Sequence, residues 1–153
     1  MTKPYRQGVF AAILNASNDV LLIQKPSYSK NDWTIVGGGR DEGESDVDNL
    51  YREIKEELGV DRAELEILGK SSVRHSYEYP VELSETLHDG KYIGQSYEIF
   101  VVRFTGNPSD MVLAEEEIAS IRWSPINDLS RYLNFPNQHK NIVAALSEVL
   151  QDR

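Results

Sequence analysis

The sequence contains no cysteine among its 153 residues. That absence excludes disulfide bonds, thiolate metal ligands and a cysteine nucleophile, and it favours a reducing compartment such as the cytoplasm. The chain also lacks an apolar run of the roughly 20 residues that a membrane-spanning helix requires. The apolar run at residues 8–14 (GVFAAIL) is short, and we interpret it as a buried strand rather than a signal peptide. We therefore expect a cytoplasmic protein with no membrane partner.

Basic residues are also scarce. The 16 lysines and arginines are outnumbered by 25 aspartates and glutamates, which gives a formal net charge of −9. Proteins that follow the backbone of duplex DNA need a basic stripe, so this charge argues against a duplex DNA partner. A small anionic ligand that arrives with its own Mg²⁺ is compatible with an acidic protein. The length suits one domain and the chain shows no internal repeat, so we expect a single domain over residues 1–153.

The periodicity of the apolar residues predicts strands in both halves of the chain, with a helix between them. We expect strands at residues 8–14, 20–24, 33–36, 65 to about 74, 96–104 and 119–123. Helices are expected between Ser45 and Gly59, across 125–133 and from 137 onward, and loops at 25–32 and 79–89. This order predicts an α/β fold in the broad sense (α+β), with a mixed sheet sandwiched between helices.

The segment 37–60 carries the residues from which chemistry can be inferred. Three glycines at 37–39 are followed by Glu44, and then by the helical glutamates Glu53, Glu56 and Glu57. Residues three and four apart share one flank of a helix, so these carboxylates repel one another. Mg²⁺ or Mn²⁺, which prefer oxygen ligands, would offset the repulsion and hold a substrate phosphate. A solvated acidic helix face is the alternative, but the glycines and the spaced glutamate favour the metal site.

The same helix has recognisable ends and a buried face. Ser45 is positioned to cap its N-terminus, and Gly59 to end it in the left-handed conformation. Arg52 lies elsewhere on the helix, where its guanidinium can pair with Glu44 or Glu53 and fix that carboxylate. The apolar residues at helical spacing, which predict the buried face, are Val47, Leu50, Tyr51, Ile54 and Leu58.

The spacing from Gly38 through Glu44 to the run 52–60 resembles, position by position, the signature of the Nudix hydrolase family. The resemblance implies an α/β/α sandwich and hydrolysis of a nucleoside diphosphate linked to another group, with Mg²⁺ or Mn²⁺ as cofactor. It assigns the metal ligands to the three helical glutamates, 53, 56 and 57, and to the carbonyl of Gly37. Arg52 matches the residue that orients a glutamate, while Glu44, Gly38 and Gly59 match positions that stabilise the motif.

A weaker similarity extends over nearly the whole chain. It resembles the branch that holds bacterial RNA 5′ pyrophosphohydrolases and dinucleoside polyphosphate hydrolases. The branch implies that Glu117 serves the metal site and catalysis from a loop. It also implies that Arg6, Tyr77 and Phe135 lie near bound phosphate or base. The motifs that carry the similarity are, in chain order, Tyr5-Arg6, Tyr77-Glu78-Tyr79-Pro80, Gly94-Gln95, Glu117 before Trp123, and Phe135.

Several of these candidates have structural alternatives. Phe135 can fill a crevice in the core instead of stacking on a base, and Tyr77 can anchor a loop. Glu115 and Glu116 compete with Glu117 for the role of the loop acid, and the spacing to Trp123 favours Glu117. His75 is a candidate polar contact or proton carrier. Basic residues that could line a phosphate entrance, or could simply be solvated, are Lys25, Lys30, Arg40, Arg74 and Lys91.

Two departures from the branch affect the substrate prediction rather than the chemistry. No proline precedes the glycines in Thr34-Ile35-Val36-Gly37, and Asn49-Leu50 stand where the branch often has small residues. Neither change replaces a carboxylate, so both leave the expected catalytic set intact.

We therefore predict a Mg²⁺-dependent hydrolase of phosphoanhydride bonds. The predicted substrate is the 5′-polyphosphate end of RNA or a dinucleoside polyphosphate, and the predicted catalytic residues are Arg52, Glu53, Glu56, Glu57 and Glu117. The alternatives are a pyrophosphatase for nucleoside triphosphates or ADP-ribose and a non-catalytic nucleotide sensor. The intact glutamates argue against a sensor, and the missing cysteine argues against an isopentenyl diphosphate isomerase. The oligomeric state is left open.

Overall fold

The structure is a computed structural model that describes residues 3–151. The expected single domain over 1–153 therefore includes four terminal residues outside the described part. The strands are β1 (Tyr5–Leu14), β2 (Val20–Gln24), β3 (Val36–Gly39), β4 (Leu65–Glu78), β5 (Gly94–Phe104) and β6 (Ser120–Ser124). The α-helices are α1 (Asp46–Leu58), α2 (Val81–Ser84) and α3 (Gln138–Gln151).

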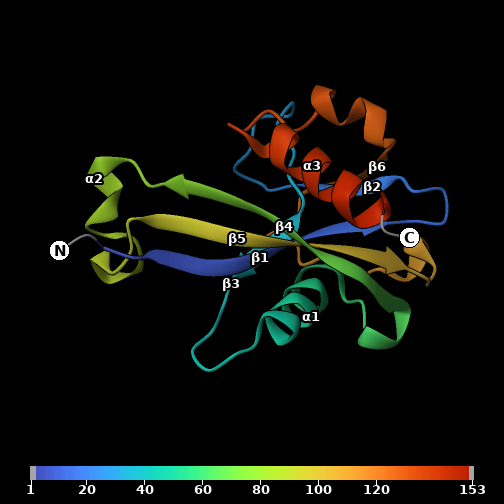
Figure 1. The fold of residues 1–153 in the computed structure, drawn as a ribbon, viewed down its shortest axis with the longest axis horizontal. Helices are drawn as coiled ribbons and strands as arrows, with labels where there is room; N and C mark the ends of the chain where they lie inside the picture. Colours follow the sequence, from blue (N-terminus) through green and yellow to red (C-terminus); the bar gives the residue numbers. More distant parts are fainter. Residues whose placement is uncertain (1–2, 152–153) are drawn as a thin grey trace.

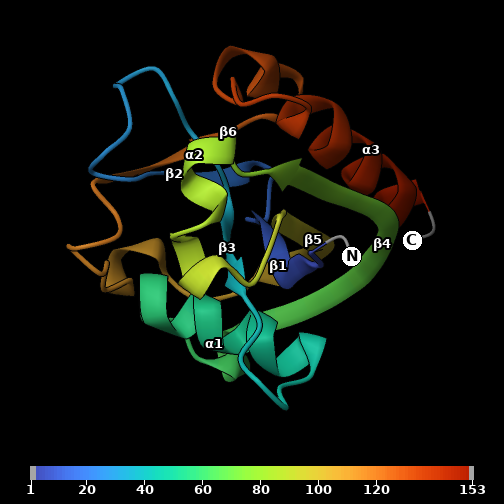
Figure 2. The same ribbon diagram turned by 90° about the vertical axis from the view of Figure 1, so that its left-hand side faces the viewer.

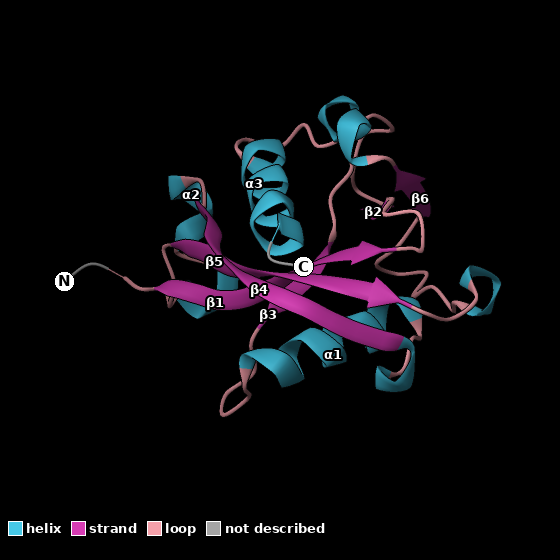
Figure 3. Ribbon diagram, turned by 45° about the vertical axis from the view of Figure 1, so that its right-hand side comes forward, coloured by secondary structure: helices cyan, strands magenta, loops and turns pink. Residues whose placement is uncertain are grey.

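The strands form one mixed sheet in the order β4-β5-β1-β2-β6, with β3 also paired to β1. β1 and β5 run parallel, whereas the β1–β2, β1–β3, β2–β6 and β4–β5 pairs are antiparallel. Helix α1 lies on one face of the sheet and α3 on the other (Figures 1 and 3). The mixed sheet between helices that the sequence predicts is confirmed.

Strand β1 divides the core between the two faces. Its odd-numbered residues Val9, Ala11 and Ile13 pack in the cluster that contains Leu50, Ile54 and Leu58 of α1. Its even-numbered residues Phe10, Ala12 and Leu14 pack with Ile142, Leu146 and Val149 of α3. Successive side chains of a strand point to opposite faces, so a strand covered on both sides reads as a continuous apolar run.

Strand β3 consists mainly of the glycines themselves, which corrects the expected strand at 33–36. Thr34 makes only an isolated bridge to Ile23, with N–H to carbonyl distances of 2.8 and 2.9 Å in the two directions. A Cβ on Gly37 would lie 2.5 Å from Cδ1 of Phe10, and a Cβ on Gly8 would lie 2.5 Å from the carbonyl oxygen of Gly38. The glycines therefore allow β3 to approach β1 more closely than larger residues could.

Other elements differ from expectation in extent or type: β1 begins at Tyr5 instead of residue 8, β5 at Gly94 instead of residue 96, and β6 is shifted by one residue. β4 continues to Glu78 instead of ending near residue 74, because it pairs with β5 as far as Gly94. The expected loop 79–89 contains α2 and the start of a 3-10 segment, Leu87–Gly90, at the end of the sheet that faces the viewer in Figure 2. The helix expected at 125–133 is a 3-10 helix, Ile126–Arg131. No helix within residues 3–151 combines the length and apolar character needed to cross a membrane.

The ends of α1 follow the sequence. Oγ of Ser45 accepts a hydrogen bond from the backbone N–H of Asp48 at 3.1 Å, which caps the first turn. Gly59 adopts φ 70°, and its N–H donates to the carbonyl of Lys55 at 2.9 Å. The caps fix where the helix begins and ends, and so determine which of its residues face β3.

Candidate active site

Two of the three helical glutamates lie on the flank of α1 that faces the glycines. Glu53 and Glu57, one turn apart, are buried, whereas Glu56 is exposed. The carboxylate of Glu53 lies directly against Gly38, where a Cβ would collide with it. The sequence predicts all three carboxylates on one flank. The structure places only two of them against β3, because Glu56 lies farther round the helix.

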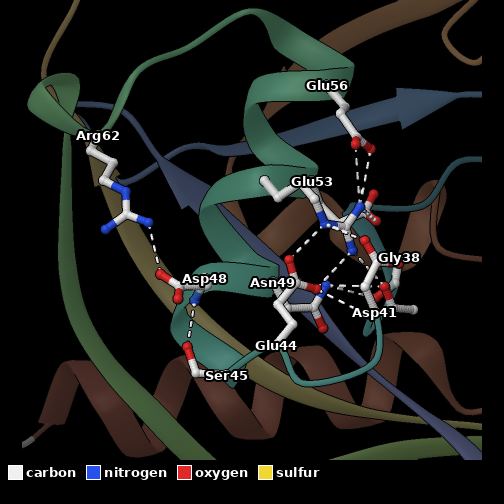
Figure 4. Close-up of polar contacts among 11 residues, drawn as sticks. Gly38, Asp41, Glu44, Ser45, Asp48, Asn49, Glu53, Glu56 and Arg62 are labelled. Carbon is white, nitrogen blue, oxygen red and sulfur yellow. Dashed lines mark hydrogen bonds and ion pairs between the residues drawn. The ribbon is translucent and has the colours of Figure 1, made fainter.

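Arg52 links the helix to the segment that precedes it. Its Nε donates to Oε2 of Glu44 at 2.7 Å and its Nη2 to Oε1 of Glu44 at 3.0 Å, which is a two-pronged pair. Its Nη1 donates to Glu53 at 3.0 Å and to Glu56 at 3.2 Å. Figure 4 labels these three carboxylates, Glu44 from the loop and Glu53 and Glu56 from the helix, and draws their hydrogen bonds as dashed lines. Arg52 thus makes both ion pairs that the sequence left as alternatives.

The same contact fixes the charge of Glu44. The hydrogen bond from Arg52 is the main cause that lowers the pKa of the Glu44 carboxyl below its ordinary value. Oε1 of Glu44 also accepts the backbone N–H of Asp41 at 3.0 Å. Glu44 is therefore an anchored carboxylate that holds the guanidinium in place.

Asn49 explains one of the departures from the branch. Its side chain is fully buried, and its Nδ2 donates to the carbonyl of Gly39 at 3.2 Å. Nη2 of Arg52 donates to the same carbonyl at 2.9 Å. A small residue at position 49 would remove one of these two side-chain links between α1 and β3.

The two buried glutamates ionise with difficulty. Burial, with smaller contributions from Glu56 and Glu117, raises the pKa of Glu53 to about 7 although Arg52 opposes the shift. Burial, then the charge of Glu53, and further the charge of Glu117, raise the pKa of Glu57 to about 8 although Lys25 opposes the shift. Like charges that share a site out of water each disfavour the ionised form of the other.

These residues fit a divalent cation. Among residues 3–151, no group of three or more acidic or histidine side chains is already arranged to hold a metal ion. However, Oε2 of Glu57 is buried without any hydrogen-bond partner, and Glu57 and Glu53 line the same cavity. A buried carboxylate oxygen without a partner is costly, and a hard cation would both pair with it and neutralise the two charges.

A cavity of about 460 Å³ opens over these carboxylates. Gly37, Gly38 and Gly39 line it, and so do Arg6, Lys25, Glu116 and Glu117. We call it the acidic cavity. The guanidinium of Arg6 lies against Gly39, where a Cβ would collide with it.

The loop that carries the additional acids is tied to α1. The N–H of Ala114 donates to the carbonyl of Glu57 at 3.0 Å, and the N–H groups of Glu117 and Ile118 donate back to the carbonyl of Ala114. Glu115, Glu116 and Glu117 are all exposed, but only Glu116 and Glu117 line the acidic cavity. Because Glu117 also raises the pKa of Glu53 and Glu57, it is the stronger candidate for the loop acid.

A second cavity of about 420 Å³ adjoins the first, with Lys25 and Gly37 in the lining of both. Its walls include the rings of Phe10, Tyr28, Tyr77, Tyr97 and Phe135, and we call it the aromatic chamber. The rings of Tyr28 and Phe135 have centroids 4.9 Å apart at an interplanar angle of 58°. Both aromatic candidates from the sequence, Tyr77 and Phe135, therefore line one hollow.

Tyr28 was missed by the sequence reasoning because it stands in the polar loop 25–32, which carries no motif. Burial is the main cause that raises its pKa to about 12, with smaller effects from Tyr77, Glu57 and Asp32. Of the five basic candidates for a phosphate entrance, only Lys25 lines either cavity. Arg74 instead pairs with Glu98 at 3.2 Å on the sheet.

The class of protein follows from the fold and the glycine–glutamate site together. The sequence profile of the NUDIX domain family matches residues 4–146, and the chain belongs to this family. The chain is 34% identical to the RNA pyrophosphohydrolase of Rickettsia canadensis over 128 residues, which are 82% of this chain and 78% of the relative. It is 35% identical to the RNA pyrophosphohydrolase of Rhodospirillum rubrum, again over 82% of this chain and 76% of the relative.

Solved structures agree on the fold. The E. coli dihydroneopterin triphosphate pyrophosphohydrolase superposes with a TM-score of 0.73 at 18% identity, covering 97% of this chain and 99% of that one. A C. elegans Ap4A hydrolase superposes with a TM-score of 0.70 at 21% identity and the same coverage. The predicted family, its branch and an enzyme of the pyrophosphohydrolase class are thereby confirmed.

Stability in the absence of metal should fall as pH rises, because Glu57 takes up a proton more readily when folded than when unfolded. Its pKa is raised from 4.5 to about 8, so its unfavourable contribution is absent below about pH 4.5 and complete above about pH 8. We expect Glu57→Gln, which cannot ionise, to melt at increasingly higher temperature than the wild type as pH increases across this window. Thermal melts in EDTA at several pH values test this, and a difference that does not change with pH would contradict it.

Proposed function

We propose that the protein is a divalent-metal-dependent hydrolase that cleaves a phosphoanhydride bond in the 5′-polyphosphate end of RNA or in a dinucleoside polyphosphate. The observation that carries the proposal is the junction of the acidic cavity with the aromatic chamber at Lys25 and Gly37. A nucleotide with a polyphosphate chain has one part for each cavity. Its anionic chain would lie in the acidic cavity with the divalent metal, and its flat base would lie in the aromatic chamber. The names of the relatives support the same substrate class.

The residues that would hold the metal are the carbonyl of Gly37 and the carboxylates of Glu53, Glu56 and Glu57. Mg²⁺ is the preferred ion and Mn²⁺ the alternative, since both favour oxygen ligands. When bound, such an ion neutralises phosphate oxygens and lowers the pKa of the attacking water. Glu56 would have to give up its pairing with Arg52 to join the site, whereas Glu57 already has a free oxygen there.

The protein residues have separable tasks in this proposal. Arg52, anchored by Glu44, keeps the carboxylate of Glu53 against Gly38. Arg6 and Lys25 are cations on the wall of the acidic cavity and would bind phosphate oxygens. Attack of water on a phosphorus breaks the bridging P–O bond. Glu117 or one of the helical glutamates takes the proton from that water.

The charge of the whole chain limits the partner. With a net charge of −9 the protein has little to offer a long nucleic acid backbone, so only the terminal nucleotides would be bound. Duplex DNA is not a partner in this proposal. The cytoplasmic location expected from the composition stays a prediction.

Hydrolysis should require a divalent metal and the buried glutamates. We expect Glu57→Gln or Glu53→Gln to lower kcat at least about a hundredfold, because a metal ligand acts on charge that develops in the transition state. The measurement is product release with Mg²⁺, with Mn²⁺ and with excess EDTA, alongside melting curves for each variant. Full activity in excess EDTA would show that the metal assignment is wrong.

The loop acid should act on kcat more than on KM. Glu117→Gln is expected to reduce kcat while leaving KM nearly unchanged, since a group that serves water or metal is used mainly in the transition state. Glu115→Gln is the matched control, because that exposed residue does not line the acidic cavity. If Glu116→Gln is the damaging change, the loop acid is Glu116. Equal and mild effects of all three would remove this loop from the mechanism.

Loss of one ring from the aromatic chamber should weaken substrate binding. Phe135→Ala is expected to raise KM by roughly tenfold, the scale of losing one base–aromatic stack. Tyr51→Ala, a ring truncation outside both cavities, serves as the control. A competition assay with 5′-triphosphorylated RNA and diadenosine tetraphosphate identifies the preferred substrate. Much faster turnover of ADP-ribose or a nucleoside triphosphate would overturn the substrate proposal and leave the family membership intact.

A further inference from the structure

Three buried polar side chains lie among the rings of the aromatic chamber. They are Thr34, His75 and Gln138, with exposed fractions of 4%, 2% and 7%. His75 comes from β4 and Gln138 is the first residue of α3, so the two approach the chamber from different elements. A base that stacks on the surrounding rings would bring its polar edge to these groups.

The ring of His75 is oriented by two contacts. It stacks on Phe10 with centroids 5.5 Å apart and an interplanar angle of 23°. Its Nδ1 lies 2.9 Å from Nδ2 of Asn141, which can only donate. Nδ1 must therefore accept, and the proton of the neutral ring is on Nε2. Burial lowers the pKa of His75, which favours this neutral form.

The amide of Gln138 is oriented in the same way. Its Oε1 accepts the hydroxyl of Thr34 at 3.1 Å in a buried contact, which turns its NH₂ group away from Thr34. Within residues 3–151, Nε2 of Gln138 and Nε2 of His75 have no hydrogen-bond partner. Neither is among the atoms that are sealed from solvent without a partner, such as Oε1 of Gln95. Both nitrogens therefore keep access to solvent, and both side chains line the chamber.

The chamber thus presents donors to the edge of a base. Guanine carries two neighbouring acceptors, O6 and N7, whereas adenine has an amino group in place of O6.

We propose that the aromatic chamber selects guanine over adenine, with His75 and Gln138 as the specificity-determining donors to O6 and N7. This deepens the proposed function, because it rests on the chamber holding the base of the substrate. It assigns His75 a polar contact with the substrate and no proton transfer.

The test is the affinity of the metal-free wild-type protein for GMP, IMP and AMP, measured by isothermal titration calorimetry. GMP and IMP, which share O6 and N7, should bind at least tenfold more tightly than AMP. Equal affinities for the three nucleotides, or tighter binding of AMP, would overturn the proposal.

Two variants locate the selectivity. Gln138→Glu keeps the acceptor for Thr34 and replaces the donor by a carboxylate, so it should remove the preference for GMP. His75→Phe keeps the ring stacked on Phe10 without the N–H, and should reduce the preference several-fold. Melting curves confirm that each variant is folded. If both folded variants keep the full preference, the donors are not His75 and Gln138.

Hydrolysis of Gp4G and Ap4A separates this inference from the proposed function. Faster hydrolysis of Gp4G, with the difference lost in Gln138→Glu, supports both. Equal hydrolysis of the two supports the proposed function and overturns the guanine preference. Hydrolysis of neither, together with selective GMP binding, overturns the dinucleoside polyphosphate as substrate and leaves the base selectivity standing.

Discussion

The pairing of Arg52 with Glu44 holds the candidate site together. A single guanidinium bonds the loop through Glu44, the glycine strand through the carbonyl of Gly39, and its own helix through Glu53. Glu44 and Gly39 lie outside α1, so the bonds to them fix how the helix lies against the loop and β3. The charge of Arg52 also opposes the rise in the pKa of the buried Glu53 carboxyl.

Because Arg52 holds the carboxylate of Glu53 in place, the backbone of β3 lies directly against that carboxylate. β3 can pass beneath Glu53 only because Gly38 has no side chain, and it can pair with β1 only because Gly37 leaves room for Phe10. The glycines are therefore needed on both sides of the strand, once for the acidic cavity and once for the core. This explains why the strand is made of residues that ordinarily weaken strands.

The sequence predicted the parts of the structure that depend on local pattern. The ends of α1, the strand β2 and the mixed sheet follow from capping residues and apolar periodicity. Spacing along the chain cannot show that one guanidinium bonds two carboxylates at once, so the pairs of Arg52 with Glu44 and with Glu53 were left as alternatives. It also cannot show that Glu56 is exposed while Glu53 and Glu57 are buried. The aromatic chamber depends on residues 28, 77, 97 and 135 meeting in space, and their positions in the chain give no periodic signal.

The two faces of the sheet carry different parts of the proposed site. The glutamates belong to the helix on one face, whereas Phe10, Tyr97 and the beginning of α3 belong to the core on the other. Substitutions under α3 can therefore change the shape of the chamber without moving a carboxylate. Such a division would let one inherited hydrolytic apparatus serve different nucleotides as lineages diverge. Solved structures of the same fold carry names as different as dihydroneopterin triphosphate pyrophosphohydrolase and Ap4A hydrolase.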